Sequence, residues 1–418
     1  MPESAPPSSP NPGFLRRLRG VGASPALRVR DFRLLWSSGV FLGVSNAGQQ
    51  VVVGWLVLQM TGDSRLVGVT LAIYFLPLLL FGLPAGALAD WLDRRRMLRA
   101  IEAGLAVTYL GMGLLVGSGE AQLWHLLAMT FAAGAFTAMV QPVRLSFSYD
   151  IVGRHDFLPG LGLLNVGQRL GNLGGALVAG RISDAWGPEF ALFALAAGHA
   201  IALGLLLLIR TPGLASGQAQ PILRNFRDYA REIRVNRTLM LFVALTGAVE
   251  IFGFSFATAL PALVRDVLDG DEADLGALHA FRAIGSILAS IGLAAVGDIR
   301  QKGRAYLLIL YAFGLSTVLL GLSPMFAAAA VTLTVVAGAS ALSDIFTQSL
   351  MQLSVRDHLH GRAMGAWIFA LGTAPLGHLQ MGFLAGIIGV GAALIVNGVA
   401  LLAVTVVTNV GSPRLRKL

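Results

Sequence analysis

The stretch from Gly86 to Arg96 reads GALADWLDRRR, and a related stretch from Ala294 to Arg304 reads AAVGDIRQKGR. Each lies between two long apolar runs, and the second begins 208 residues after the first, about half the length of the 418-residue chain. Membrane proteins built from internal repeats show this kind of symmetry in their sequences. The sequence therefore predicts two copies of one membrane unit joined in tandem.

The composition also places the chain in a membrane. Hydrophobic residues make up 55% of the chain and charged residues 13%, and the mean hydropathy is +0.72. A soluble domain of this length needs more polar surface than this composition provides. Cysteine is absent, which excludes disulfides, thiol catalysis and cysteine metal sites. The net charge of +9 is explained by topology charges, and we expect no nucleic-acid partner.

Apolar segments long enough to cross a bilayer recur along the chain. We expect twelve, over 34–60, 66–90, 97–117, 122–143, 158–185, 189–209, 239–264, 275–298, 305–322, 325–353, 361–387 and 390–410. The predicted organisation is a disordered cytoplasmic tail (1–30), a six-helix bundle (31–210), a cytoplasmic linker (211–237), a second six-helix bundle (238–410) and a short cytoplasmic tail (411–418). In the linker, arginines recur at the spacing of a basic amphipathic helix, as Arg224, Arg227, Arg231 and Arg234.

Basic residues predict the orientation of the chain. We number the connections between spans from the N-terminus. Of the 31 lysines and arginines, 26 lie in or beside the two tails and the even-numbered connections. Three lie at the odd-numbered connections (Arg65, Arg181 and Arg265), and Arg169 and Arg282 lie inside spans. Cytoplasmic loops carry the excess of basic residues in membrane proteins. We therefore expect a multi-pass protein of the bacterial inner membrane with both termini in the cytoplasm.

These residues resemble the major facilitator superfamily. GALADWLDRRR is similar to the superfamily's loop signature between helices 2 and 3, and the stretch around Asp298 lies where the superfamily repeats it. LRVRDFRLLW from Leu27, WLVLQMTGDSRLVG from Trp55 and GRAMGAWIFALGTAPLG from Gly361 are similar to the subgroup of enterobactin and macrolide exporters. The resemblance covers about 27–410. It implies an all-α fold of twelve transmembrane helices in two pseudo-symmetric six-helix bundles.

The loop signature predicts a gate at the cytoplasmic face. A glycine at position 86 permits close helix approach, an aspartate at position 90 can cap a helix N-terminus, and the following arginines hold the turn at the headgroups. The resemblance implies that this aspartate contacts the start of helix 11, and that Asp298 makes the related contact near Pro159 and Gly160. The alternative is that the arginines only set topology. The expected gating residues are Gly86, Asp90, Arg94, Arg95, Asp298, Arg304 and Arg362.

Polar side chains inside the expected spans recur on single helix faces. The clearest stripe is in helix 5, where Asn165, Gln168, Arg169 and Asn172 follow a 3.6-residue period. Because polar groups are costly in lipid, such stripes must face protein or water. The resemblance implies a central cavity lined by helices 1, 4, 7 and 10. The expected cavity residues are Asn46, Gln49, Gln50, Asn165, Gln168, Arg169, Asn172, Thr246, Arg282, Ser343 and Thr347.

Two acids inside expected spans, Glu250 in helix 7 and Asp344 in helix 10, are the candidate proton carriers. Glu250 lies about eleven residues into its helix, roughly 17 Å deep. A charged carboxylate is costly there, so the group can bind and release a proton as the cavity alternates between the two sides. Arg169 lies at a similar depth, which predicts a charge pair with Glu250 across the two halves. Static helix packing is the alternative role.

With the resemblance, the sequence predicts a monomeric secondary transporter in the lipid bilayer that exports a hydrophobic or amphipathic small molecule in exchange for protons. The cargo would be a drug, a macrolide or a siderophore. No nucleotide-binding loop is present and no histidine has a metal-ligand partner at usable spacing, so we expect no enzyme activity, cofactor or metal. The alternatives are a metabolite importer or facilitator of the same fold, and a non-transporting membrane sensor or scaffold.

Overall fold

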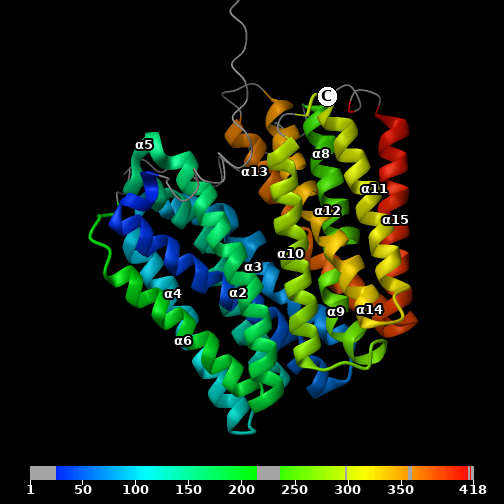
Figure 1. Ribbon diagram of the computed structural model, residues 1–418, viewed down its shortest axis with the longest axis horizontal. Helices are drawn as coiled ribbons and strands as arrows, with labels where there is room; N and C mark the ends of the chain where they lie inside the picture. The colour runs from blue at the N-terminus through cyan, green and yellow to red at the C-terminus, as the bar shows by residue number, and fades with distance from the viewer. Residues whose placement is uncertain (1–24, 214–235, 297–298, 356–359, 413–414, 416–418) are drawn as a thin grey trace, which may run out of the picture.

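A computed structural model describes residues 25–213, 236–296, 299–355, 360–412 and 415, without the side chains of 82–90, 154, 158 and 360–362. All the regular elements in these residues are helices. Figure 1 shows two groups, α2 to α6 on the left and α8 to α15 on the right, which lie together at the lower end of the view and diverge towards the upper end. The predicted linker helix and most of both predicted tails lie outside the described residues.

The first group contains five long helices, and one of them includes two membrane spans. After a short 3-10 helix (η1, Pro25–Arg28) come α2 (Arg30–Thr61), α3 (Ser64–Trp91), α4 (Arg94–Gly117), α5 (Leu123–Trp186) and α6 (Pro188–Leu207). α5 includes the fourth and fifth expected spans because the connection between them is also helical. It bends at Gly153, whose φ of 69° lies in the left-handed region that glycine adopts without steric cost.

The second group contains two helices that are interrupted inside the membrane. Helix 7 is formed by α8 (Arg237–Ala248), a π-helical segment η2 (Val249–Phe254) and α9 (Phe256–Asp266). Helix 11 is formed by α13 (His360–Leu371) and α14 (Ala374–Ile388), and its break precedes Pro375, which has no backbone N–H to continue the helix. The others are α10 (Glu272–Val296), α11 (Lys302–Gly321), α12 (Phe326–Leu353) and α15 (Val390–Gly411).

The described residues therefore form the predicted architecture, twelve membrane-spanning helices in two bundles of six. Eleven helical segments are each long and apolar enough to cross a bilayer. The expected fifth span, 158–185, is not among them. It is the part of α5 that carries the polar stripe.

Glycines bring α5 into direct contact with α2. A Cβ at Gly171 would collide with the carbonyl oxygen of Val40, and one at Gly175 with the carbonyl oxygen of Val44. Gly43 makes the reciprocal approach from α2 to the backbone of α5. Small residues permit such backbone contact between membrane helices. The packing fixes the register of the two helices and sets their polar stripes side by side.

A buried pair joins α4 to α6 inside the first bundle. The Nδ1 atom of His199 lies 2.7 Å from the Oε2 atom of Glu102, and both side chains are 1% exposed. The ring of Tyr109 stacks on His199 with centroids 5.4 Å apart. Because both partners belong to the same bundle, this pair can stay intact when the two bundles move.

Candidate functional site

A cavity of about 870 Å³ lies between the two bundles. Helices α2, α3 and α5 line it on one side, and α10, α12 and α13 on the other. Its polar wall is formed by Asn46, Gln50, Thr137, Gln141, Asn165, Gln168, Arg169, Asn172, His279, Arg282, Ser286 and Gln348. Its larger apolar residues are Tyr74, Phe75, Leu78, Leu145, Leu161, Trp367, Ile368 and Leu371. This size and mixed lining suit an amphipathic small molecule.

The polar stripes of helices 1 and 5 face this cavity. Of the expected cavity residues, Asn46, Gln50, Asn165, Gln168, Arg169, Asn172 and Arg282 line it. The stripe of helix 5 is also bonded to the preceding span, because the Nε2 atom of Gln141 donates to the Oε1 atom of Gln168 at 3.0 Å. The cavity therefore gathers polar groups that lie far apart in the sequence, from Asn46 to Gln348.

Four expected cavity residues, Gln49, Thr246, Ser343 and Thr347, are buried away from it. The hydroxyl of Thr347 donates to the Tyr306 hydroxyl at 2.8 Å, and that of Thr246 donates to the carbonyl oxygen of Phe242 at 2.7 Å. Gln49 and Ser343 are 2% and 1% exposed and are not among the lining residues. Their helices do reach the centre, but these positions lie on faces that pack within the protein.

Arg282 connects the two bundles at the cavity wall. Its Nη1 atom donates to the Oε1 atom of Gln50 in α2 at 2.9 Å. The guanidinium carbon also lies 5.5 Å from the centroid of the Phe256 ring, within cation–π range. Arg282 is thus held by an amide and an aromatic ring rather than by an acid.

The acid that interacts electrostatically with Arg169 is Asp344 in α12, whereas the depths of the residues predict Glu250. Arg169 and Asp344 attract each other across the two bundles, although no ion pair within 4.0 Å joins them in the described residues. Glu250 lies in the π-helical segment and is 7% exposed. Asp344 is its charged neighbour, so the second bundle holds two acids close enough to repel each other.

Several cavity residues were not predicted. Tyr74, Phe75 and Trp367 come from helices that are apolar on most faces, so periodicity gives no sign of their position. Gln141 and Gln348 are polar residues inside expected spans, and that signal alone could have identified them. His279 lines the cavity although no pattern singles it out.

At the end of the molecule away from the termini, the bundles meet backbone to backbone. A Cβ at Gly68 in α3 would lie 2.9 Å from the Cα atom of Gly382 in α14. A Cβ at Gly180 in α5 would lie 2.6 Å from the carbonyl oxygen of Glu272 and 3.0 Å from the Cα atom of Gly276 in α10. We call the region of these two crossings, Gly68–Gly382 and Gly180–Gly276, the closed end.

Two arginines reinforce the closed end from opposite bundles. The Nη2 atom of Arg65 in α3 donates to the carbonyl oxygen of Gly386 near the end of α14 at 3.4 Å. The Nη1 atom of Arg265 in α9 donates to the carbonyl oxygen of Leu58 near the end of α2 at 3.2 Å. Cations are stabilised near helix C-termini, where carbonyl groups lack helical partners. Each bundle thus caps a helix of the other.

The expected gating residues that the structure describes lie at the opposite end, and those with described side chains bond locally. Arg94 pairs with Asp150 in α5 at 2.7 Å, and Arg95 donates to the carbonyl oxygen of Arg210 at 3.1 Å. Arg304 donates to Gln301 at 2.9 Å and is exposed. Gly86 lies in α3, whereas the side chains of Asp90 and Arg362, and the whole of Asp298, lie outside the described residues. In the described residues no group of three or more His, Asp or Glu side chains could hold a metal.

The sequence matches a family model described as transmembrane secretion effector, over residues 22–416. The chain belongs to this family of the major facilitator superfamily. It is similar to the staphyloferrin A transporter of Staphylococcus aureus, with 24% identity over 90% of this chain and 94% of the relative. It is also similar to macrolide efflux protein A of Streptococcus pyogenes, with 20% identity over 70% of this chain and 73% of the relative.

The fold is that of solved transporters. The nucleoside transporter NupG superposes with a TM-score of 0.76 over 91% of this chain and 99% of its own, at 12% identity. The chain is therefore a multi-pass membrane transporter and not an enzyme, and transporters of this kind bind small-molecule substrates. The family explains why the polar cavity lies at the interface between two bundles.

Proposed function

We propose that this transporter exports an amphipathic small molecule by alternating access, in exchange for protons. The observation that carries the proposal is the polar cavity between two bundles that meet backbone to backbone at only one end among the described residues. Rocking one bundle against the other would expose the same cavity to the other side. The names of the relatives, a macrolide efflux protein and a staphyloferrin transporter, support a drug-type or siderophore-type cargo.

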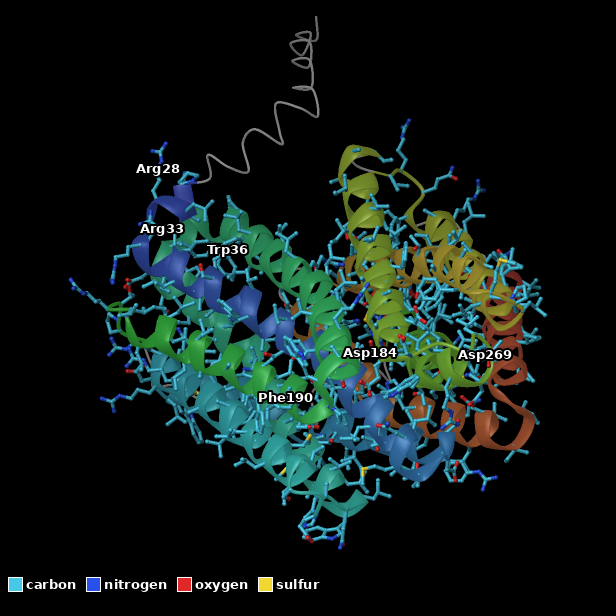
Figure 2. All side chains as sticks on the ribbon, turned by 60° about the horizontal axis from the view of Figure 1, so that its bottom comes forward. Arg28, Arg33, Trp36, Asp184, Phe190 and Asp269 are labelled. Carbon is cyan, nitrogen blue, oxygen red and sulfur yellow. The ribbon has the colours of Figure 1, made fainter. Side chains whose placement is uncertain are left out.

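The orientation that we propose places the closed end outside the cell and both termini in the cytoplasm of a bacterium. Figure 2 shows Arg28 and Arg33 at one end of the first bundle, Asp184 further along that bundle, and Asp269 on the second bundle. An excess of basic residues marks the cytoplasmic side of membrane proteins. In this orientation the structure is the inward-facing state, with a cavity ready to load from the cytoplasm.

Proton coupling would act through Asp344, with Glu250 as its acidic neighbour. Asp344 attracts Arg169 across the two bundles, and this attraction holds the unloaded cavity in one arrangement. Protonation of Asp344 would remove the attraction, and so would a cargo that engages Arg169. Either event then permits the bundles to rock, which is the requirement for exchange of cargo against protons.

At the cytoplasmic end we propose a gate that forms when the bundles close there. Gly86 and Asp90 at the end of α3 would meet Arg362 at the start of α13, and Asp298 would act in the related position of the second half. Arg94 and Arg95 would hold this loop against α5 and the end of α6, where they bond now. The closed end shows that these helices can approach closely at their other termini.

The test uses purified protein in proteoliposomes that contain a pH-sensitive dye. Erythromycin and an acidic amphiphile, dansylglutamate, are added in turn to wild type, Asp344→Asn and Glu250→Gln. We expect substrate-evoked proton flux in the wild type and at least a tenfold loss in Asp344→Asn. Glu120→Gln, in an exposed connection, is the matched control.

Three outcomes would change the proposal. Flux that persists in Asp344→Asn but disappears in Glu250→Gln would place the proton carrier on helix 7. Substrate movement without proton movement would identify a facilitator. No movement of either probe or of protons in folded protein would count against proton-coupled export.

A further inference from the structure

We propose that the cavity selects a cargo that carries carboxylate groups, held between Arg169 of the first bundle and Arg282 of the second. This inference deepens the proposed function and rests on it only for the step that carries the cargo across. It starts from the charges of the cavity wall. Among the described residues that line the cavity, these arginines are the two arginine or lysine side chains, and none is an aspartate or a glutamate.

The electrostatic environment of the wall favours an anion. Asp344 attracts Arg169 and has Glu250 as its own acidic neighbour, but neither acid is among the described lining residues. In a site with low polarisability, a charge acts on a ligand more strongly than it does in water. A ligand that carries a positive charge would be repelled by both arginines. A ligand with one or two carboxylates would be attracted from both sides.

Arg169 has hydrogen-bond donors to offer. In the described residues its guanidinium makes no hydrogen bond and no ion pair within 4.0 Å, although it lies well inside the membrane-spanning part of α5. An arginine in this position needs a partner, because an unsatisfied charge at membrane depth is costly. The planar guanidinium matches a carboxylate with two parallel hydrogen bonds.

The side chain of Arg282 is oriented by the groups around it. Gln50 accepts one of its five N–H donors, and the Phe256 ring lies at cation–π distance. These contacts fix the direction of the side chain and leave further donors for a ligand. Because Gln50 belongs to the first bundle and Arg282 to the second, an anion that binds here acts on the interface that must move.

The rest of the wall indicates what the remainder of the cargo is like. Carboxamide side chains supply both donors and acceptors around the arginines, and they fit hydroxyl or amide groups of the cargo. The rings of Tyr74, Phe75 and Trp367 provide an apolar part. The predicted cargo class is thus an amphipathic carboxylate with hydroxyl or amide groups, rather than a cationic amphiphile.

The absence of cysteine makes a direct test possible. A single cysteine is introduced in the cavity at Leu145, and another, in a separate variant, at exposed Ser118. Each purified protein in nanodiscs reacts with anionic sulfonatoethyl and with cationic trimethylammonioethyl methanethiosulfonate. The ratio of the two rates is divided by the ratio for free cysteine. In the cavity we expect this corrected ratio to favour the anionic reagent by about tenfold or more. At Ser118 we expect the corrected ratio to be near one.

The arginines must cause this preference. The double change Arg169→Gln and Arg282→Gln should reduce it to below about threefold, and the two lysine variants should keep it. Arg237→Gln, an exposed arginine outside the cavity, is the matched control. Unchanged elution on size exclusion confirms that each variant is folded. A cavity cysteine that reacts equally with both reagents, or a preference that survives the double change, would overturn the inference.

A second measurement tests binding itself. Dansylglutamate and its diamide have nearly the same size and differ in charge, and their fluorescence increases in an apolar site. We expect the acid to bind at least tenfold more tightly, with the difference lost in the double glutamine variant. Equal affinity, or no binding of the acid, contradicts the inference. Neither measurement needs transport. An anion-selective cavity without proton flux would therefore reject the proposed function alone. Proton flux without anion selectivity would reject this inference alone.

Discussion

The closed end and the cavity join the same two bundles by different means. At the closed end, glycines place backbone against backbone at Gly68–Gly382 and Gly180–Gly276. In the cavity, charges and amides meet across the interface, as between Arg282 and Gln50. Close-packed contacts are either made or broken, whereas charges respond to protons and ligands. The comparison separates a contact that depends on shape from one that can respond to the cargo.

The largest effect on the closed arrangement should come from placing a bulky side chain at a glycine crossing of the closed end. In Gly180→Val the new side chain collides with the backbone of α10, and overpacking of this kind costs roughly 1–3 kcal/mol. We expect the equilibrium to shift away from the closed arrangement by roughly 5- to 150-fold. Spin labels on Asp63→Cys and Asp269→Cys, one on each bundle, would report longer distances by double electron–electron resonance.

Gly174 provides the matched control for that experiment. It lies in the same helix, but a Cβ there meets nothing within 4 Å. Gly174→Val should leave the distance distribution as in the wild type. If both variants give the same distribution, the closed end does not depend on the close approach of these backbones.

A change in the cavity should have the next largest effect, with the opposite sign. In Gln50→Glu the hydrogen bond to Arg282 becomes an ion pair across the two bundles. We expect a more populated closed arrangement and at least a threefold weaker binding of dansylglutamate, because the arginine is neutralised. Gln59→Glu, in the same helix but exposed and not among the lining residues, is the control for binding. Binding that is unchanged in Gln50→Glu would separate Arg282 from the anion site.

A smaller effect is expected from the arginines of the closed end. Arg65→Gln and Arg265→Gln remove one hydrogen bond each to a helix terminus of the other bundle. These side chains are 44% and 34% exposed, so each bond should contribute only about 0.5–1 kcal/mol. The spin-label populations should change about two- to fivefold. A change as large as that in Gly180→Val would mean that these bonds, rather than glycine packing, dominate the closed end.

The smallest effect on movement should come from the buried pair in the first bundle. Glu102→Gln weakens the contact with His199, and a disturbed buried polar group costs about 1–3 kcal/mol. We expect a lower melting temperature in detergent but an unchanged distance distribution, because the pair does not cross the interface. His199→Gln should act similarly. A shift in the spin-label distances would show that the inside of the bundle is coupled to its movement.

The spans, the two bundles and most of the polar wall could be predicted because hydropathy and the cost of polar groups in lipid are strong signals. Asn165 to Asn172 form a stripe on one face, and that face had to meet water or protein. Periodicity does not show whether such a polar face lines a water-filled cavity or packs against protein. Ser343 and Thr347 share a helix with Gln348, yet only the glutamine lines the cavity.

Other features depend on packing that sequence spacing does not contain. The π-helical segment around Glu250 and the break before Pro375 alter the depth and direction of side chains in helices 7 and 11. Depth counted at a constant rise per residue therefore assigned the wrong acid to Arg169. Tyr74 and Trp367 line the cavity from helices that are apolar on most faces, where periodicity does not distinguish a cavity face from a lipid face.

The two arginines of the cavity wall also bear on how the membrane voltage acts on transport. The interior of a cell is electrically negative, and moving one elementary charge across 100 mV corresponds to about 2.3 kcal/mol. An anionic cargo that leaves the cytoplasm moves with this voltage, which corresponds to a roughly 50-fold accumulation outside for each net charge exported. The voltage would act against a cationic cargo leaving by the same route. A cavity lined by arginines thus matches outward transport to the electrical polarity of the membrane.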